Sequence, residues 1–211
     1  MQFEIIGGGN LGSSLARLLT GLGHAVQVQV QNPNDEKYGT LAALPNVELA
    51  ATGKADANAD MIFLATPWVA TLGAVEALGD LSGRTLVDCT NPVTYGASGM
   101  ALAIDANSSA TEMIAAQASS AIVAKCFNQL GTPVLDNLTA LQPTPIMGIA
   151  CDDQTVATNL KQLASDMGFD AIHVGGLANA RLLESFALLW MSQAFSSGDP
   201  SGFAFARSAP S

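Results

Sequence analysis

Three glycines near the amino terminus have the spacing of a phosphate-binding loop. They are Gly7, Gly9 and Gly12, in the run IIGGGNLG that begins at residue 5. In a strand–turn–helix unit the first glycine allows a tight turn, the second lets a diphosphate approach the backbone, and the third lets the helix pack closely on the strand. The free amides of Asn10 and Leu11, at the start of that helix, would face the phosphates with help from the helix dipole.

The elements that this motif needs are predicted on both sides of it. Residues 3–6 form an apolar strand, a helix with a leucine face begins near residue 10, and residues 25–30 form a second strand. A GxGxxG motif alone is weak, but inside a strand–helix–strand unit of about thirty residues it indicates a dinucleotide. Lys-Ser or Lys-Thr does not follow the glycines, which excludes a P-loop. We therefore expect a nicotinamide dinucleotide on a Rossmann-type unit.

The choice between NADP and NAD depends on the end of the second strand. An NAD site usually has Asp or Glu there to bind the ribose hydroxyls, whereas this chain has Gln31 and Asn32. Neither side chain would repel a 2′-phosphate, and Lys37 could pair with it. Lys37 could equally be an ordinary solvated lysine. The sequence favours NADP and leaves NAD open.

Strand and helix patterns alternate along the rest of the chain, which predicts an α/β fold. We expect a Rossmann-type, doubly wound, mainly parallel sheet with helices on both faces, in a single domain over residues 1–195 with extra C-terminal strands and a helix. Residues 196–211 are rich in Ser, Gly and Pro and are expected to be a loosely ordered tail. Residues 91–107 are expected to be an irregular substrate loop. Further strands are expected near residue 47 and at 61–65, 85–89, 122–124, 146–150 and 171–174, and further helices at 69–78, 111–118, 154–167 and 179–195.

The bulk composition narrows the classes of partner. The formal net charge is −10, from 8 basic and 18 acidic residues, which disfavours nucleic acid and anionic membrane surfaces. No apolar run is long enough to span a membrane, and the first residues lack a basic and then apolar signal pattern. We therefore expect a cytoplasmic protein.

The cysteines and histidines do not suggest a metal. Cys89, Cys126 and Cys151 are widely spaced without a CxxC pair, so we expect buried thiols and neither a disulfide framework nor a zinc site. His24 and His173 have no partners at metal-ligand spacing. His24 is expected to mark a turn, and His173 is expected to be structural, with a role at the mouth of the site as the alternative.

Five segments together resemble a known family. The run GGGNLGSSLARLL at residues 7–19 resembles the NADP oxidoreductases that depend on the deazaflavin coenzyme F420, and also the dinucleotide domain of the STEAP-type ferric reductases. Four further segments match this family in order: LATPW at 64–68, DCTNP at 88–92, KCFN at 125–128 and ARLLE at 180–184. The resemblance covers the chain to about residue 195.

The resemblance implies where the nicotinamide lies. Ala65, Thr66 and Pro67, and likewise Asn91 and Pro92, would line its pocket. This placement agrees with the rule that ligands bind outside the carboxyl ends of the strands in such sheets. Taken alone, each pair could simply be a strand that ends at proline.

The resemblance also implies residues for a second substrate. Phe127 and Asn128 follow another strand and would flank that substrate. Arg181 has two readings: it pairs with Glu184 on the surface of one helix, which would contribute only about 0.2–0.5 kcal/mol, or it binds an anionic part of the substrate.

The predicted activity is hydride transfer between a nicotinamide dinucleotide and a deazaflavin, a flavin or another small acceptor. Such a step needs positioning more than acid–base chemistry, which suits a chain without a Ser-His-Asp set. The alternative is a non-catalytic sensor that binds NADP or NADPH. An imine or 2-hydroxy acid reductase normally has a large helical domain, and about 65 residues after Pro145 are too few for it by typical domain sizes.

The last predicted helix points to a homodimer. One face should pack on the sheet, and a second apolar face would be exposed in a monomer. Related reductases pair through this end of the chain, so the resemblance also implies a two-fold dimer, although the tail could instead cover the helix within one subunit. The apolar positions are Leu182, Leu183, Phe186, Leu188, Leu189, Trp190 and Met191.

Overall fold

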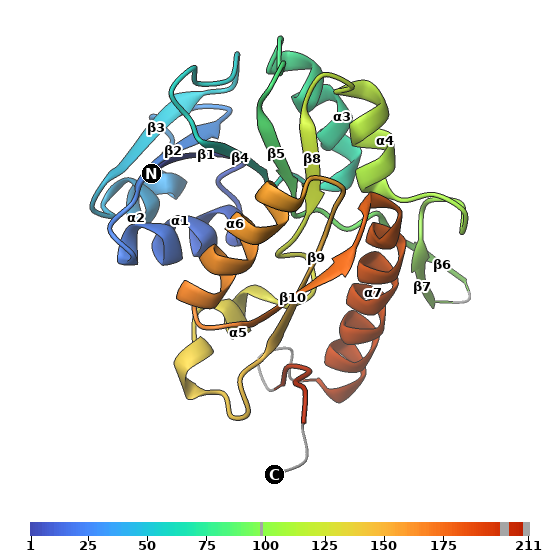
Figure 1. Cartoon of the computed structure of the whole chain (residues 1–211). Coiled ribbons are helices and arrows are strands. Elements are labelled where there is room, and N and C mark those ends of the chain that lie inside the picture. Colours follow the sequence, from blue (N-terminus) through green and yellow to red (C-terminus); the bar gives the residue numbers. More distant parts are fainter. Residues whose placement is uncertain (98, 199–202, 209–211) are drawn as a thin grey trace.

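An eight-stranded sheet with the order β10-β9-β8-β5-β4-β1-β2-β3 forms the centre of the molecule (Figure 1). The computed structural model describes residues 1–97, 99–198 and 203–208. The strands of the sheet are β1 (Gln2–Ile6), β2 (Ala25–Val30), β3 (Val47–Ala51), β4 (Met61–Leu64), β5 (Thr85–Asp88), β8 (Ile122–Lys125), β9 (Ile146–Cys151) and β10 (Asp170–Gly175).

The sheet is mainly parallel, as predicted. Strands β1 to β5 and β8 all run in the same direction, and only β9 pairs antiparallel to its neighbour β8. Strand β10 then lies parallel to β9. The carboxyl ends of six neighbouring strands therefore meet at one edge of the sheet, which is where ligands bind in such folds.

Helices cover both faces of the sheet, and alternate residues of its strands enter two separate cores. Phe3 and Ile5 of β1 pack with helices on one face, whereas Ile6 packs with those on the other. Both faces of the central strands are therefore buried, as is typical of a parallel sheet. The helices are α1 (Asn10–Gly21), α2 (Gly39–Ala42), α3 (Trp68–Ala77), α4 (Ala110–Gln117), α5 (Thr132–Leu135), α6 (Gln154–Asp166) and α7 (Ala180–Ser197), with 3-10 turns η1 (Glu36–Tyr38), η2 (Leu138–Ala140) and η3 (Leu177–Asn179).

Each helix lies on the face of the sheet whose core contains its apolar residues. Leu15 and Leu19 of α1 and Leu160 of α6 belong to one core, while Val75 of α3 and Ile114 of α4 belong to the other. The sheet is thus wound on both faces, and the predicted fold class is confirmed.

The expected irregular loop at residues 91–107 is partly wrong. Within it, β6 (Val93–Gly96) and β7 (Gly99–Leu102) form an antiparallel hairpin. Val93 and Tyr95 favour strand, and Gly99 has φ 102°, a conformation that suits glycine at a tight connection. The Gly, Ala and Ser content of the segment concealed this short pattern. The hairpin lies beside α7 (Figure 1).

The described part of the tail, which the sequence predicts to be loosely ordered, contacts the domain. Helix α7 continues to Ser197, and residues 203–208 pack back on the domain. The indole Nε1 of Trp190 donates to the carbonyl of Phe203 at 3.0 Å, and the ring of Phe205 lies 4.9 Å from that of Phe186. Aromatic burial therefore orders a segment whose polar neighbours suggested disorder; 199–202 and 209–211 lie outside the described residues.

Two further sequence predictions can be compared with the structure. All three cysteines are buried as free thiols, as expected. None of the helices in the described part of the chain combines the length and the apolar character needed to cross a membrane.

Candidate functional site

The glycine loop has the geometry that its spacing predicts. Gly7 has φ 110°, and a Cβ at this position would lie 2.7 Å from the carbonyl oxygen of Ala65. A Cβ at Gly12 would collide with the carbonyl of Gly7. Both contacts are with backbone, so no side chain can move to relieve them. These two glycines let the end of β1, the start of α1 and the end of β4 come together.

Gly9 differs from the other two because nothing fills the space beside it. No heavy atom lies within 4 Å of the place where its Cβ would be. Gly9 is also the N-cap of α1, which has no side-chain cap and no acidic residue in its first turn. An open space at an uncapped helix start fits a phosphate group, which the backbone amides and the helix dipole favour.

A cavity of about 420 Å³ extends from this loop along the carboxyl edge of the sheet. It contains several of the predicted site residues, from three separate segments of the chain. Those that line it are Gly7, Gly9, Gln31, Ala65, Thr66 and Pro67; Asn10, Leu11, Gly12, Asn32, Lys37, Asn91 and Pro92 do not.

The cavity also has walls that the sequence analysis missed. Tyr38 forms part of it, and a Cβ at Gly8 would lie 2.6 Å from Val30 and 3.0 Å from the ring of Tyr38. Gly8, the middle one of the three consecutive glycines, therefore also has little room for a side chain. One face of α3 presents only small residues to the cavity, at the i, i+3, i+4 and i+7 spacing that could have revealed it: Ala70, Gly73, Ala74 and Ala77.

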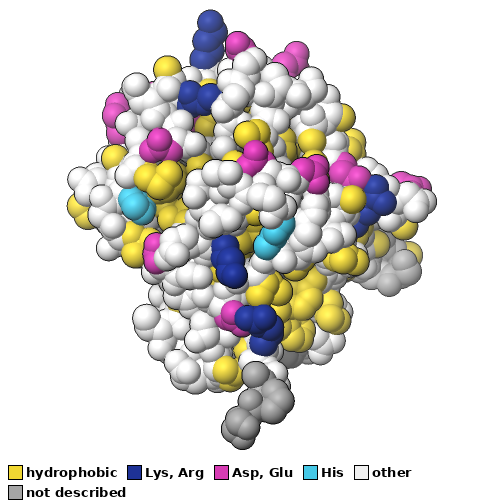
Figure 2. All heavy atoms as spheres, viewed as in Figure 1, with side chains coloured by type: hydrophobic (Ala, Val, Ile, Leu, Met, Phe, Trp, Pro, Cys, Tyr) yellow, Lys and Arg dark blue, Asp and Glu magenta, His cyan; other side chains and the backbone are white. Residues whose placement is uncertain are grey.

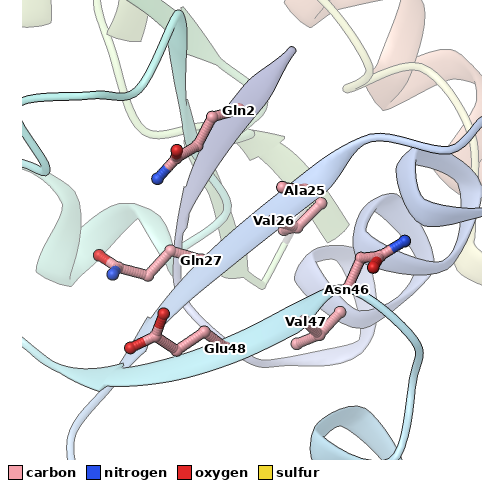
Figure 3. A pocket seen from close by; sticks show the side chains of 7 residues that line it. All are labelled: Gln2, Ala25, Val26, Gln27, Asn46, Val47 and Glu48. Atoms are coloured by element: carbon pink, nitrogen blue, oxygen red, sulfur yellow. The ribbon is translucent and has the colours of Figure 1, made fainter.

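A second hollow, of about 320 Å³, lies at the opposite edge of the sheet (Figure 3). Its lining comes from the amino ends of β1, β2 and β3, and Figure 3 shows Gln2, Gln27 and Glu48 projecting from the three strands. It has no helix start or glycine loop, and it faces away from the carboxyl ends. We therefore place the site at the larger cavity.

Lys37, the candidate for a 2′-phosphate, is already paired in the structure. Its Nζ lies 2.9 Å from Oδ2 of Asp35 and 4.9 Å from the centre of the Tyr38 ring. The hydrogen bond with Asp35 raises the pKa of Lys37, and the same bond lowers the pKa of Asp35. The side chain is 58% exposed. A phosphate at this position would have to compete with the Asp35 carboxylate.

The structure brings Asn91 and Asn128 together at the ends of β5 and β8. The Asn91 amide donates to the carbonyl of Asn128 at 2.7 Å, and the Asn128 amide donates to Oδ1 of Asn91 at 2.9 Å. Asn128 also donates to the carbonyl of Leu183 in α7 at 3.2 Å. Pro92, next to this pair, is buried. Two segments that the resemblance assigns to different substrates are thus joined directly.

Phe127 lies differently from what its predicted role suggests. Its side chain is 1% exposed and packs between the rings of Phe63 and Phe169 in the core. Its φ is 60°, an uncommon value for a residue other than glycine. The turn that this conformation makes directs the chain from β8 to Asn128, so any contact of Phe127 with a ligand would use its backbone.

The suggested pair between Arg181 and Glu184 is wrong. The Nε of Arg181 donates to Oε2 of Glu112 at 2.8 Å, and its Nη2 donates to Oε1 at 2.5 Å. Glu184 instead points inward and is 1% exposed. Residues three apart on a helix can pair on its surface. Here the carboxylate of Glu184 instead accepts a hydrogen bond from a buried ammonium group.

That ammonium belongs to Lys125, which sequence analysis did not single out as charged. Its side chain is fully buried at the end of β8. Its Nζ donates to Oδ2 of Asp88 at 2.8 Å, to Oε1 of Glu184 at 3.1 Å and to the carbonyl of Thr90 at 2.6 Å. The hydroxyl of Thr111 donates to Asp88 at 2.8 Å. We call these four side chains, Asp88, Thr111, Lys125 and Glu184, the buried ionic cluster.

Electrostatics keep the lysine of this cluster charged. Burial alone would lower the pKa of Lys125, but the charges of Asp88 and Glu184 outweigh burial and raise that pKa. Burial raises the pKa of Glu184, and the charge of Lys125 opposes this rise. A buried lysine that keeps its proton cannot act as a general base.

One buried polar atom near the cluster lacks a partner in the described structure. The hydroxyl of Thr90, between Cys89 and Asn91, is buried and has no hydrogen bond. Buried hydroxyls are normally satisfied. Together with the open space at Gly9, this atom indicates that the carboxyl edge fits a bound group. No set of three or more potential ligands in the described residues could hold a metal ion.

The comparisons with known proteins agree with this geometry. Residues 2–92 match the family described as NADP oxidoreductase, coenzyme F420-dependent. The matched region contains the glycine loop, Thr66-Pro67 and Asn91-Pro92, so the resemblance expected from the sequence is confirmed there. At a coarse level the match makes the first 92 residues similar to NADP-dependent oxidoreductases, and it does not define a hydride acceptor.

A curated relative and two solved structures extend the likeness. The chain is 29% identical to metalloreductase STEAP3 of Rattus norvegicus over 189 residues, which are 87% of this chain and 36% of that protein. A structure from Arthrobacter sp. FB24, described as a candidate F420-dependent NADP-reductase, has a TM-score of 0.88 and 23% identity, covering 98% of this chain and 100% of that one. A reductive aminase of Aspergillus terreus has a TM-score of 0.63 and 19% identity, covering 93% and 62%. These two structures establish the Rossmann-like fold.

The open space at Gly9 gives a direct test of the site. Gly9→Val should fold, because no protein atom contests the new side chain, but it should abolish NADPH binding by occupying the phosphate position. Gly21→Val is a matched control at the far end of the same helix, where a Cβ also meets nothing within 4 Å. Calorimetric titration with NADPH checks both variants. A folded Gly9→Val protein with near-normal affinity would remove the site from this loop.

Proposed function

We propose that this chain transfers a hydride between NADP(H) and a small redox acceptor, with a deazaflavin preferred and a flavin as the alternative. The observation that carries the proposal is the uncapped start of α1 at Gly9, open to a cavity at the carboxyl edge. The family match over residues 2–92 supports the coenzyme. The similarity to proteins described as an F420-dependent NADP-reductase and a metalloreductase supports a redox acceptor.

The residues of the cavity suit the two halves of the coenzyme. The small face of α3 and Tyr38 offer an apolar space for the adenine. The amides of Asn10 and Leu11, at the uncapped start of α1, would face the diphosphate. From the diphosphate, the coenzyme would extend past Thr66 and Pro67 toward Asn91, where its nicotinamide ring would lie. When bound, this ring supplies or accepts the hydride.

The protein contributes position to this step. The mutual hydrogen bonds of Asn91 and Asn128 fix the ends of β5 and β8 against each other. A fixed wall holds two rings at reacting distance, which can supply several kcal/mol of the barrier through orientation alone. Arg181 has 38% of its side chain exposed and would need to exchange Glu112 for an anionic group of the acceptor.

An acceptor screen tests the proposal. NADPH oxidation should be measured with coenzyme F420, FMN, FAD and a ferric chelate, and we expect turnover with the deazaflavin or with a flavin. The Gly9→Val variant should lose that turnover. Tight NADPH binding without turnover on any acceptor would refute the enzyme and favour the NADP-dependent sensor.

The ion pair at Lys37 predicts a modest coenzyme preference. NADPH should bind about tenfold more tightly than NADH, roughly 1.4 kcal/mol, since Lys37 must leave Asp35 to reach the 2′-phosphate. Lys37→Ala should erase the preference without weakening NADH, and Asp35→Asn should increase it. Lys161→Ala, an exposed lysine on α6, is the control for loss of charge. Equal affinities of the unmodified protein for both coenzymes would remove the case for NADP.

The outer face of α7 supports a homodimer. Leu182 and Leu189 are seven residues apart and are 62% and 50% exposed. Figure 2 shows hydrophobic side chains gathered where Figure 1 places α7. The ordered tail covers Phe186 and Trp190 but leaves these leucines exposed. We therefore propose a two-fold pair of chains that covers this face, a common arrangement of homo-oligomers.

Light scattering at micromolar concentration tests the dimer. The expected mass is twice the single-chain value of 21.6 kDa. The double variant Leu182→Ser with Leu189→Ser should return the protein to the single-chain mass, because it removes the apolar contact without disturbing buried residues. Val69→Ser, a 95% exposed residue on α3, is the control. A single-chain mass of the unmodified protein would contradict the proposal.

A further inference from the structure

The buried ionic cluster has an unbalanced charge. One ammonium, that of Lys125, faces the carboxylates of Asp88 and Glu184, so its formal charge is one positive against two negative, −1 in all. All three side chains are at most 1% exposed. Water cannot screen this excess as it screens a surface charge, and a buried charge therefore acts over a longer distance.

The cluster lies directly behind the Asn91–Asn128 pair, because three segments of the chain contribute to both. The Thr90 carbonyl accepts from Lys125, and the next residue, Asn91, belongs to the pair. Lys125 lies three residues before Asn128 along the same turn. Asn128 donates to the carbonyl of Leu183, the residue before Glu184. In each of the three segments, the residue that contributes to the cluster is therefore within three positions of a residue that contributes to the Asn91–Asn128 pair, beside the proposed nicotinamide position.

The other charged side chain pair on these helices does not cancel the excess. Arg181 and Glu112 neutralise each other on the surface of α7 and α4. The backbone N–H of Ala110 donates to Glu184 at 3.2 Å, and that of Thr90 donates to Asp88 at 2.9 Å. These N–H groups are dipoles that stabilise the two carboxylates but add no charge to the cluster.

The oxidised and reduced forms of the coenzyme differ in the charge of the nicotinamide ring. Loss of a hydride turns the neutral dihydronicotinamide ring into a cation, while the rest of the molecule keeps its charge. A fixed negative charge nearby stabilises the cation selectively. It would make bound NADPH a stronger hydride donor, because the product of donation is the form that the protein prefers.

We propose that the buried ionic cluster tunes the coenzyme toward hydride donation by stabilising the oxidised nicotinamide ring. Asp88 and Glu184 are then positioning and electrostatic residues that act without touching the substrate. The inference rests on the proposed function for the location of the ring, but its test needs only the coenzyme and does not depend on which acceptor is used.

The test is the ratio of dissociation constants for NADP⁺ and NADPH, measured by calorimetry. Glu184→Gln removes one charge, keeps the contact with Lys125 through its carbonyl oxygen, and gives up the bond from Ala110. Asp88→Asn removes the same charge and gives up a different bond, the one from Thr90. Both should shift the ratio in favour of NADPH by about tenfold, the size expected for a unit charge roughly 10 Å away at an effective dielectric constant of about 20.

Thr111→Val is the matched control inside the cluster. It removes a hydrogen bond to Asp88 but no charge, so it should lower the melting temperature and leave the ratio unchanged. Circular dichroism establishes which variants fold, and the two charge variants lose different contacts, so either one alone is informative.

Three results would overturn the inference. A folded charge variant whose ratio stays within about twofold of the unmodified protein would contradict it, and so would a Thr111→Val ratio that shifts as far as the charge variants. If the unmodified protein binds neither form of the coenzyme, the proposed function fails first and this inference fails with it. Normal binding with an unshifted ratio overturns only the inference.

Discussion

The close approach of backbone segments at Gly7 and Gly12 is the constraint on which the site depends. A Cβ at Gly12 would meet the carbonyl of Gly7, and a Cβ at Gly7 would meet that of Ala65. Three chain segments can therefore touch only if two positions have no side chain. Their contact places the amides of α1 and the end of β4 around one cavity. Gly9, which lies between these two glycines in the sequence, leaves the remaining space free for a ligand.

Buried polar side chains join the segments that meet at the carboxyl edge of the sheet. Lys125 joins the ends of β5, β8 and α7 through Asp88, Thr90 and Glu184. A second group, Glu4 with Gln29, performs a similar role between β1 and β2, where Gln29 also lines the cavity. Such buried charges add little net stability compared with apolar packing. Their effect here is to join the strand and loop ends around the cavity through specific contacts.

Much of this could be predicted from the sequence, because the informative signals are local. The GxGxxG spacing, the apolar strands and the leucines of α1 are all patterns within a few residues, and they predicted the sheet and the phosphate-binding loop. The wrong predictions concerned long-range contacts. Glu184 is three residues from Arg181, yet its partner, Lys125, lies 59 residues away. Phe203 and Phe205 become ordered only because α7 and β9 provide a surface for them. Tyr38 lines the cavity because it ends the 3-10 turn η1, and the local sequence did not predict where that turn would lie.

The positions of the two tryptophans have a consequence for spectroscopy. Trp68 is the first residue of α3, directly after Pro67 at the rim of the cavity. Trp190 lies far along α7, packed on Phe203 at 5.7 Å between ring centres. The intrinsic fluorescence of this chain therefore comes from two chromophores with separate surroundings, one beside the cavity residue Pro67 and one against Phe203 of the tail. Replacing either by phenylalanine would leave a single emitter, so that ligand binding and docking of the tail can be followed independently in the same molecule.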